Sequence, residues 1–165
     1  EYIVLDTFQA GLSWQIILRK RENFRHAFDN FNTVKIARYT EAKLAKLMTD
    51  SGIIRNRLKI KGTVKNAQSF LKIQKEFGSF SKYLWSFVDH QPIIHKLQKD
   101  SQIASSNRES DTLSQDLKKR GFTFVGTTIC YAFMQGAGLV NDHLTTCFRY
   151  SEVFPLKFDR TDNIC

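Results

Sequence analysis

Two glycines bracket a short apolar turn, GFTFVG, at residues 121–126. Glycine permits backbone conformations that turn successive N–H groups to one side, and a helix N-terminus behind them attracts an anion. Lys118, Lys119 and Arg120 come directly before the turn and add positive charge. This combination could bind a DNA phosphate without reading the base sequence. The pattern alone is more typical of a plain connection between two helices with one capping glycine.

A histidine and a cysteine, His143 and Cys147, are four residues apart in the last part of the chain. On a helix this spacing places both side chains on one turn, as two ligands of a zinc ion require. Two ligands do not complete a tetrahedral structural site, so the pair by itself is a weak indication of metal. The histidines His26, His90 and His95 show no comparable pairing.

One acid, Asp6, interrupts an otherwise apolar helical stretch at residues 2–8. A carboxylate in this setting either faces solvent or lines a site, and residue type alone leaves both interpretations open. Leu12 and Trp14 follow shortly afterwards. Taken alone, both are predicted to be ordinary core residues.

The chain is strongly basic, with a formal charge of +9 and a pI near 9.6. The charge is clustered: the segment 53–75 contains seven Lys or Arg residues and no acid, and further groups lie at 19–25 and 118–120. Each cluster alone could be a solvated helix face. Three clusters in one chain favour a polyanion such as nucleic acid as the partner.

The 165 residues are enough for one domain with its own core, and 42% of them are hydrophobic. No stretch is apolar for long enough to span a bilayer, and no secretory signal opens the chain. The cysteines Cys130, Cys147 and Cys165 are scattered and odd in number, which fits a reducing cytoplasm. Because Glu1 replaces an initiator Met inside a helical pattern, we expect a chain that is cut at its front.

The chain is predicted to be helical throughout, because it has two prolines and eight glycines and little two-residue alternation. A helix is expected over residues 13–28. A long amphipathic helix is expected where Ile60 opens a stripe that recurs at 64, 67 and 71. Ser110 is the predicted N-cap of a helix that Gly121 ends, and the next helix begins near Gly126.

Several blocks of sequence are long and specific: FQAGLSW at 8–14, KREN at 20–23, GIIRNR at 52–57, LWSFVDHQP at 84–92, KKRGFTFVGTTIC at 118–130 and GLVNDH at 138–143. In these blocks the chain resembles the DNA-3-methyladenine glycosylase I (Tag-type) family. The resemblance is collinear from residue 1 to about residue 150. It implies an all-α, helix-hairpin-helix DNA glycosylase fold in one domain over 1–150, with 121–126 as the hairpin and 151–165 as a tail of unknown role.

The resemblance implies base-excision repair. The enzyme would flip 3-methyladenine out of alkylated duplex DNA and hydrolyse its N-glycosidic bond with water, without a lyase step. Asp6 would be the catalytic and base-binding carboxylate, Trp14 a pocket aromatic and Leu12 a wedge in the duplex. The family typically carries glutamate at the position of Asp6, so the carboxylate here is one methylene shorter.

The same resemblance implies the remaining contacts. The DNA-binding residues would be Lys119, Arg120, Gly121, Phe124, Gly126 and Thr127, together with Leu12. His143 and Cys147 would bind a structural zinc ion with a cysteine and a histidine near the N-terminus. That pair, together with a pocket tyrosine, would precede Glu1. The implied partner is double-stranded DNA with alkylated adenine, bound by a cytoplasmic monomer with no membrane contact.

Two alternatives stay open at this point. The shorter Asp6 and the expected missing front leave room for a helix-hairpin-helix protein that binds DNA or flipped bases without cleaving them. A glycosylase for a different modified purine would share the same sequence features. Base release from defined lesions separates these functions.

Overall fold

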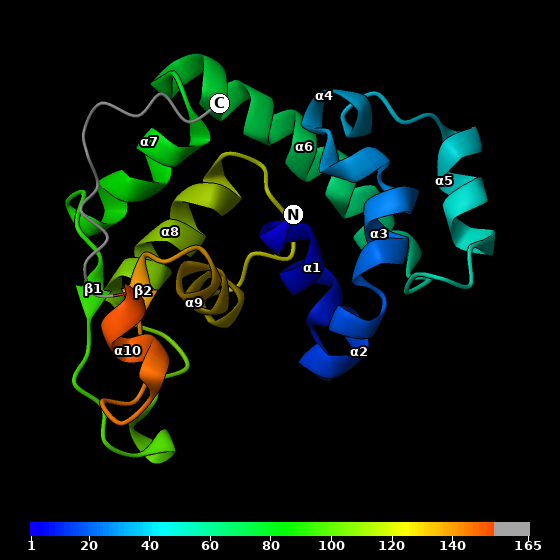
Figure 1. Cartoon of the computed structure of the whole chain (residues 1–165). Helices are drawn as coiled ribbons and strands as arrows, with labels where there is room; N and C mark the ends of the chain where they lie inside the picture. The colour runs from blue at the N-terminus through cyan, green and yellow to red at the C-terminus, as the bar shows by residue number, and fades with distance from the viewer. Residues whose placement is uncertain (154–165) are drawn as a thin grey trace.

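One long helix, α6 (Arg57–Phe77), organises the molecule. The computed structural model describes residues 1–153 of the chain, and α6 runs across these residues from one side to the other (Figure 1). The helix begins at Asn56, whose side chain accepts the Lys59 N–H at 3.1 Å. It ends at Gly78, which adopts a positive φ of 82° that favours glycine.

Short helices lie around the first half of α6. They are α1 (Tyr2–Gln9), α2 (Trp14–Arg19), α3 (Arg21–Ala27), η1 (Asp29–Phe31), α4 (Thr33–Ile36) and α5 (Glu41–Thr49). Their buried side chains include Leu5, Phe8 and Phe24, which form one core with Ile60 and Ala67 of α6. The apolar stripe predicted for α6 therefore faces this core.

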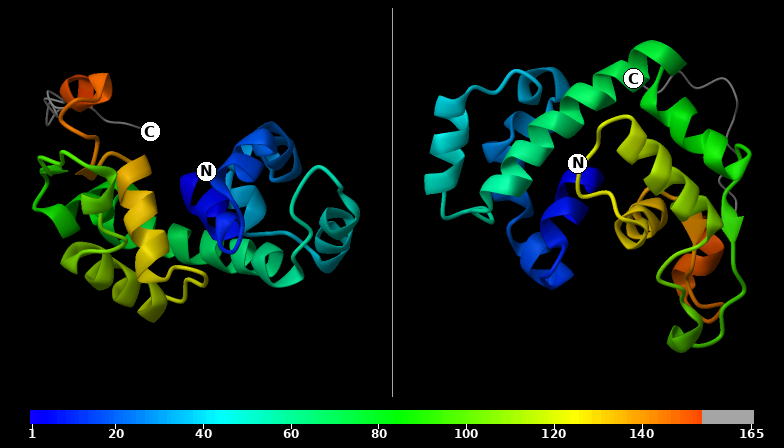
Figure 2. Two further views of the ribbon diagram at one scale, coloured as in Figure 1. Left: turned by 90° about the horizontal axis from the view of Figure 1, so that it is seen from below. Right: turned by 180° about the vertical axis from the view of Figure 1, so that it is seen from behind.

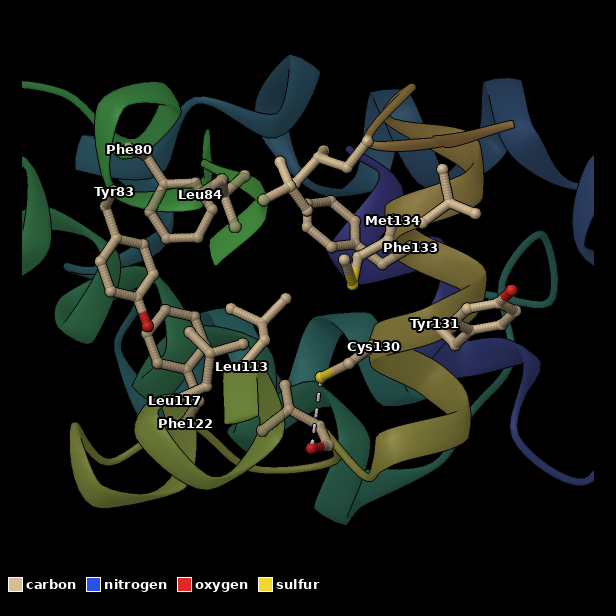
Figure 3. Packing of buried hydrophobic residues seen from close by; sticks show 14 of the residues in the cluster. Phe80, Tyr83, Leu84, Leu113, Leu117, Phe122, Cys130, Tyr131, Phe133 and Met134 are labelled. Carbon is tan, nitrogen blue, oxygen red and sulfur yellow. Dashed lines mark hydrogen bonds between the residues drawn. The ribbon is translucent and has the colours of Figure 1, made fainter. Parts of the chain in front are cut away.

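A second core lies at the other end of α6, where Ile73 is buried. The elements in this part of the molecule are α7 (Phe80–Trp85), η2 (Ser86–Val88), β1 (Ile93–Ile94), η3 (Asp100–Gln102), α8 (Arg108–Lys119), α9 (Thr127–Gly136), β2 (Val140–Asn141) and α10 (Phe148–Val153). Figure 3 shows how Leu113 and Leu117 of α8 face Met134 of α9 across this core. The hairpin residues Phe122 and Val125 are buried in it as well.

The predicted all-α fold is confirmed, with one small addition. The two-residue strands β1 and β2 pair in parallel, with Ile93 opposite Val140 and Ile94 opposite Asn141. Helix α8, a short turn and helix α9 form the predicted helix-hairpin-helix unit. None of the helices within residues 1–153 is long and apolar enough to cross a bilayer.

Two predicted helix boundaries were wrong. The helix expected over 13–28 is two helices that meet at Lys20, whose Nζ donates to the carbonyls of Ser51 and Gly52 at 3.0 and 3.2 Å. The N-cap of α8 is Asn107, and Ser110 is instead the third helical residue, which completes a capping box. The periodicity of apolar residues indicates neither the long-range contact of Lys20 nor the capping role of Asn107.

The predicted tail falls partly outside the described residues. Helix α10 begins before residue 150 and continues three residues beyond it, so a regular element crosses the predicted boundary. Cys130 and Cys147 are free thiols, and Cys165 lies outside the described residues. The division at residue 150 stays a prediction.

Candidate active site and DNA interface

The carboxylate of Asp6 is buried without a hydrogen-bond partner. Only 6% of the residue is exposed, and no donor reaches its buried Oδ2 within the described part of the chain. The hydroxyl of the next residue, Thr7, is buried and unpaired in the same way. Buried polar atoms without partners cost free energy in a folded protein, and such atoms are often found at functional sites.

The packing of α1 explains why Asp6 stays inside. Leu5 and Phe8, on either side of it in sequence, are fully buried in the first core, and α1 also contacts α9. Burial raises the pKa of Asp6 to about 7. The solvent-facing interpretation of Asp6 is therefore wrong, and its carboxyl can change charge near neutral pH.

The turn between α1 and α2 carries Leu12 and Trp14. Gly11 adopts a φ of 83°, and the Leu12 N–H then returns to the Gln9 carbonyl at 2.7 Å. Leu12 is half-buried, and Trp14 is 36% exposed at the first position of α2. Neither residue is a fully buried core residue, so both are accessible from the surface beside the helix that holds Asp6.

The turn at 121–126 has a conformation suited to an anion. Gly121 and Phe124 have positive φ angles of 92° and 59°, and Gly126 is the N-cap of α9. No side chain caps the N-terminus of α9, so its first N–H groups are available to a phosphate. Phe122 and Val125 are buried beneath the turn, whereas Phe124 is 38% exposed.

The basic residues before the hairpin differ in their surroundings. Lys119 is exposed. Arg120 is turned toward the protein, where its guanidinium pairs with Asp116 at 2.6 Å and Glu76 at 2.7 Å. The Thr127 hydroxyl is also used internally, because it donates to Asp111. The positions of Lys119 and Gly126 therefore suit a DNA contact better than the side chains of Arg120 and Thr127 do.

Substituting Arg120 tests this distinction. Its guanidinium also lies 4.9 Å and 5.2 Å from the ring centroids of Phe77 and Tyr83, so Arg120→Ala removes two ion pairs and two cation–π contacts. We expect a loss of about 1–2 kcal/mol in unfolding free energy, with little change in DNA affinity. Lys119→Ala should show the opposite: weaker DNA binding and unchanged stability. Denaturant unfolding and fluorescence anisotropy measure the two effects, and equal losses of affinity would contradict the assignment.

His143 and Cys147 lie close enough to share a metal ion. The distance between His143 Nδ1 and Cys147 Sγ is 3.8 Å, and ligand atoms of a tetrahedral zinc site are about 3.6 Å apart. The preceding residue, Asp142, is held by the Tyr131 hydroxyl at 2.6 Å and by Gln135 at 2.7 Å, which ties this segment to α9. Within residues 1–153, no group of three or more His, Cys, Asp or Glu side chains could hold a metal.

A cavity of about 180 Å³ lies beside the start of α1. Residues from α1, α4 and α6 line it together with Phe122 of the hairpin. Neither Asp6 nor Trp14 is among its lining residues.

Two residues of α6 were missed as candidates because they looked like parts of a charged helix. Lys59 belongs to the basic run at 53–75, yet it is only 8% exposed and donates to the carbonyls of Phe8 and Ala10. Asn66 is 5% exposed and bonds the backbone of Thr123. The sequence feature that could have indicated them is their spacing on α6, which places both beside the apolar stripe.

Comparisons with known proteins place this arrangement in a family. The sequence matches the methyladenine glycosylase family over residues 1–150. It is 49% identical over 150 residues to DNA-3-methyladenine glycosylase 1 of Escherichia coli (strain K12), covering 91% of this chain and 80% of the relative. The chain belongs to the methyladenine glycosylase family.

Solved structures agree with this membership. A crystal structure of 3-methyladenine DNA glycosylase I superposes with a TM-score of 0.86 at 48% identity, covering 89% of this chain and 81% of that one. A variant of such an enzyme in complex with 3-methyladenine also gives a TM-score of 0.86, at 38% identity and with coverages of 88% and 78%. The predicted family and its helix-hairpin-helix glycosylase fold are confirmed.

Proposed function

We propose that this protein is a base-excision DNA glycosylase that removes 3-methyladenine from alkylated duplex DNA. Its relatives bear the name of that activity, and one related structure holds 3-methyladenine. The observation that carries the proposal for this chain is the buried, unpartnered carboxylate of Asp6 on α1. A buried carboxylate whose Oδ2 accepts no hydrogen bond from the described residues suits a cationic base that can donate hydrogen bonds.

The chemistry of the lesion suits this site. Adenine alkylated at N3 is positively charged, so its glycosidic bond is weak and the base leaves readily. In a water-poor pocket the Asp6 carboxylate would attract the cation more strongly than it attracts neutral adenine. An aromatic face such as that of Trp14 would add roughly 0.5–2 kcal/mol for the cationic ring. Water would then attack the sugar, which leaves an abasic site and an intact strand.

The hairpin and the Leu12 turn would prepare the substrate. The uncapped N-terminus of α9 would hold a phosphate, and Lys119 would add charge beside it. Leu12 would fill the gap that the extruded nucleotide leaves in the duplex. Both elements belong to a single chain, so we propose that the protein acts as a monomer. Its free thiols Cys130 and Cys147 fit a reducing compartment, the cytoplasm.

A lesion panel tests this function. Duplexes with 3-methyladenine, 7-methylguanine or hypoxanthine are incubated with the protein, and released bases are separated by chromatography. We expect release of 3-methyladenine only. Release of another purine would redirect the substrate assignment, while tight DNA binding without any release would support the non-catalytic alternative.

The rate of base release should depend on pH through Asp6. Its raised pKa of about 7 means that the carboxyl of the free protein is charged above pH 7 and protonated below it. We expect kcat/KM to be constant above about pH 8 and to fall roughly tenfold per unit well below pH 7. Binding of undamaged duplex over the same range is the control. A profile that is flat down to pH 5.5 would exclude the ionised carboxylate as the active form.

We also propose that His143 and Cys147 supply two ligands of a structural zinc ion. Their 3.8 Å separation supports this proposal, although the described residues contain no third ligand beside them. A bound ion would stabilise the segment around α10 and take no part in base release. Titration of the protein with zinc tests the proposal, since His143→Ala should bind zinc more weakly than the unmodified protein does.

A further inference from the structure

Three residues on one face of α6 contact the two parts of the candidate site, which are the end of α1 with the Leu12 turn and the hairpin at 121–126. Lys59, Gly62 and Asn66 are three and four residues apart, a spacing that aligns side chains along a helix. All three are buried. Figure 2 shows α6 passing beside both α1 and the connection between α8 and α9. Lys59 contacts the end of α1, and the other two residues contact the hairpin.

The Lys59 ammonium binds the end of the helix that carries Asp6. Its Nζ donates to the Phe8 carbonyl at 3.1 Å and to the Ala10 carbonyl at 2.7 Å. Carbonyls at the end of a helix lack partners within the helix, and a cation there also interacts favourably with the helix dipole. Ala10 lies directly before Gly11 and Leu12. Lys59 therefore fixes the point where α1 ends and the Leu12 turn begins.

The Asn66 side chain holds the hairpin by both of its amide atoms. Oδ1 accepts the Thr123 N–H at 2.8 Å, and Nδ2 donates to the Thr123 carbonyl at 3.0 Å. The next hairpin residue, Phe124, has a positive φ of 59°. Its ring lies so close to Gly62 that a Cβ added there would be 2.8 Å away. Asn66 and Gly62 together set the position and conformation of the turn.

We propose that α6 is the element that sets the spacing between the phosphate-binding hairpin and the turn that carries Leu12, with Asn66 and Lys59 as its positioning residues. This inference rests on the proposed glycosylase function. The seven residue steps from Lys59 to Asn66 span about 10 Å of rigid helix. A duplex anchored at the hairpin then presents its damaged nucleotide at a fixed distance from Asp6 and Leu12. Misplacement by about 1 Å in such a site costs roughly 100-fold in rate.

The two residues should affect different steps. Lys59→Met keeps the length of the side chain and removes the two hydrogen bonds at the end of α1. We expect the rate of base release at saturating duplex to fall roughly 10- to 100-fold, with the Kd for undamaged duplex unchanged. Lys59→Arg keeps a cation and should recover part of the rate. Lys20→Met is the matched control, because Lys20 also donates to two carbonyls, those of Ser51 and Gly52.

Asn66→Ala should act on binding instead. It frees the hairpin backbone, which must then be ordered when a phosphate binds, so we expect the Kd for undamaged and damaged duplex to rise about tenfold in parallel. In the bound complex the phosphate holds the hairpin in place, so the saturated rate should stay nearly unchanged. Gln68→Ala is the matched control, because Gln68 is on the same helix and bonds the Ala37 carbonyl at 3.0 Å. All variants are compared below their unfolding temperatures, so that a loss of folded protein is not counted as a loss of function.

The outcomes separate this inference from the proposed function. A Lys59→Met rate equal to that of Lys20→Met, or an Asn66→Ala affinity equal to that of Gln68→Ala, would overturn the inference. Proportionate losses of rate and affinity in both variants would overturn it as well. If the unmodified protein releases no base, the proposed function fails. The Asn66 role is then still tested by duplex affinity, and the Lys59 role by 2-aminopurine fluorescence, which reports base extrusion beside an abasic-site analogue.

Discussion

Replacing Asp6 by asparagine is expected to lower the single-turnover rate of 3-methyladenine release about 100- to 1000-fold. The substitution keeps the shape of the side chain and removes the charge that would stabilise the cationic base and the developing sugar cation. Because the hairpin is untouched, the affinity for undamaged duplex should stay within about twofold. Quenched-flow measurement of the released base, with protein in excess over a methylated duplex, gives the rate directly.

The same variant should be more stable than the unmodified protein at pH 8. A carboxyl whose pKa rises from 3.8 to about 7 on folding binds its proton more tightly in the folded state. Folding stability therefore falls as the pH rises from 3.8 to 7, and the full loss is present above pH 7. Asp6→Asn removes this loss, so we expect a gain of roughly 2–4 kcal/mol at pH 8 that vanishes near pH 4.

A remote exposed carboxylate provides the control for both effects. Asp100 is exposed at the start of η3, and Asp100→Asn should change neither the release rate nor the stability. If Asp6→Asn gains stability and loses activity, Asp6 serves ligand binding and lowers the free energy of unfolding of the protein without ligand. An Asp6→Asn variant that releases the base at the rate of the unmodified protein would remove Asp6 from the mechanism.

Replacing Gly126 by valine is expected to weaken duplex binding by about tenfold or more and to leave the fold intact. Gly126 has an ordinary φ of −62°, and a Cβ added there would meet no atom within 4 Å. The protein itself therefore does not require a glycine at this position. A bulky side chain at the uncapped N-terminus of α9 would occupy the space through which a phosphate approaches. Fluorescence anisotropy with undamaged duplex measures the affinity.

Gly121 offers the contrasting substitution. Its φ of 92° is strained for any other residue, and a Cβ there would lie 3.3 Å from the Ser69 hydroxyl. Gly121→Val should therefore cost about 1–3 kcal/mol of stability, whereas Gly126→Val should cost less than about 0.5 kcal/mol. Undiminished duplex affinity in Gly126→Val would show that this turn is only a connection between two helices.

Patterns within short stretches of sequence predicted the helices and turns that depend on neighbouring residues. The apolar stripe beginning at Ile60 predicted α6, and the glycines at 121 and 126 predicted the hairpin between two helices. The break at Lys20 was not predictable from periodicity, and the Lys20 side chain donates there to the distant carbonyls of residues 51 and 52. Helix periodicity reports which face is buried and carries no information about which distant carbonyl a side chain reaches.

The site was predictable only in part, and for the same reason. Asp6 became a candidate through the family resemblance, since an acid in a short apolar helix is otherwise ambiguous. The basic runs counted Lys59 and Arg120 as surface charge, yet one is buried against α1 and the other pairs with Asp116 and Glu76. Charge counts indicate a polyanionic partner, and only the three-dimensional arrangement separates residues free to meet it from residues that hold the protein together.

The central claim is that this chain cleaves the glycosidic bond of 3-methyladenine in duplex DNA. A time course with protein in excess over a duplex carrying a single 3-methyladenine tests it most directly, against the spontaneous loss of the base without protein. We predict rapid release of free 3-methyladenine, an abasic site in its place and an uncut strand. Release no faster than the spontaneous loss, from a duplex that the protein demonstrably binds, would contradict the claim.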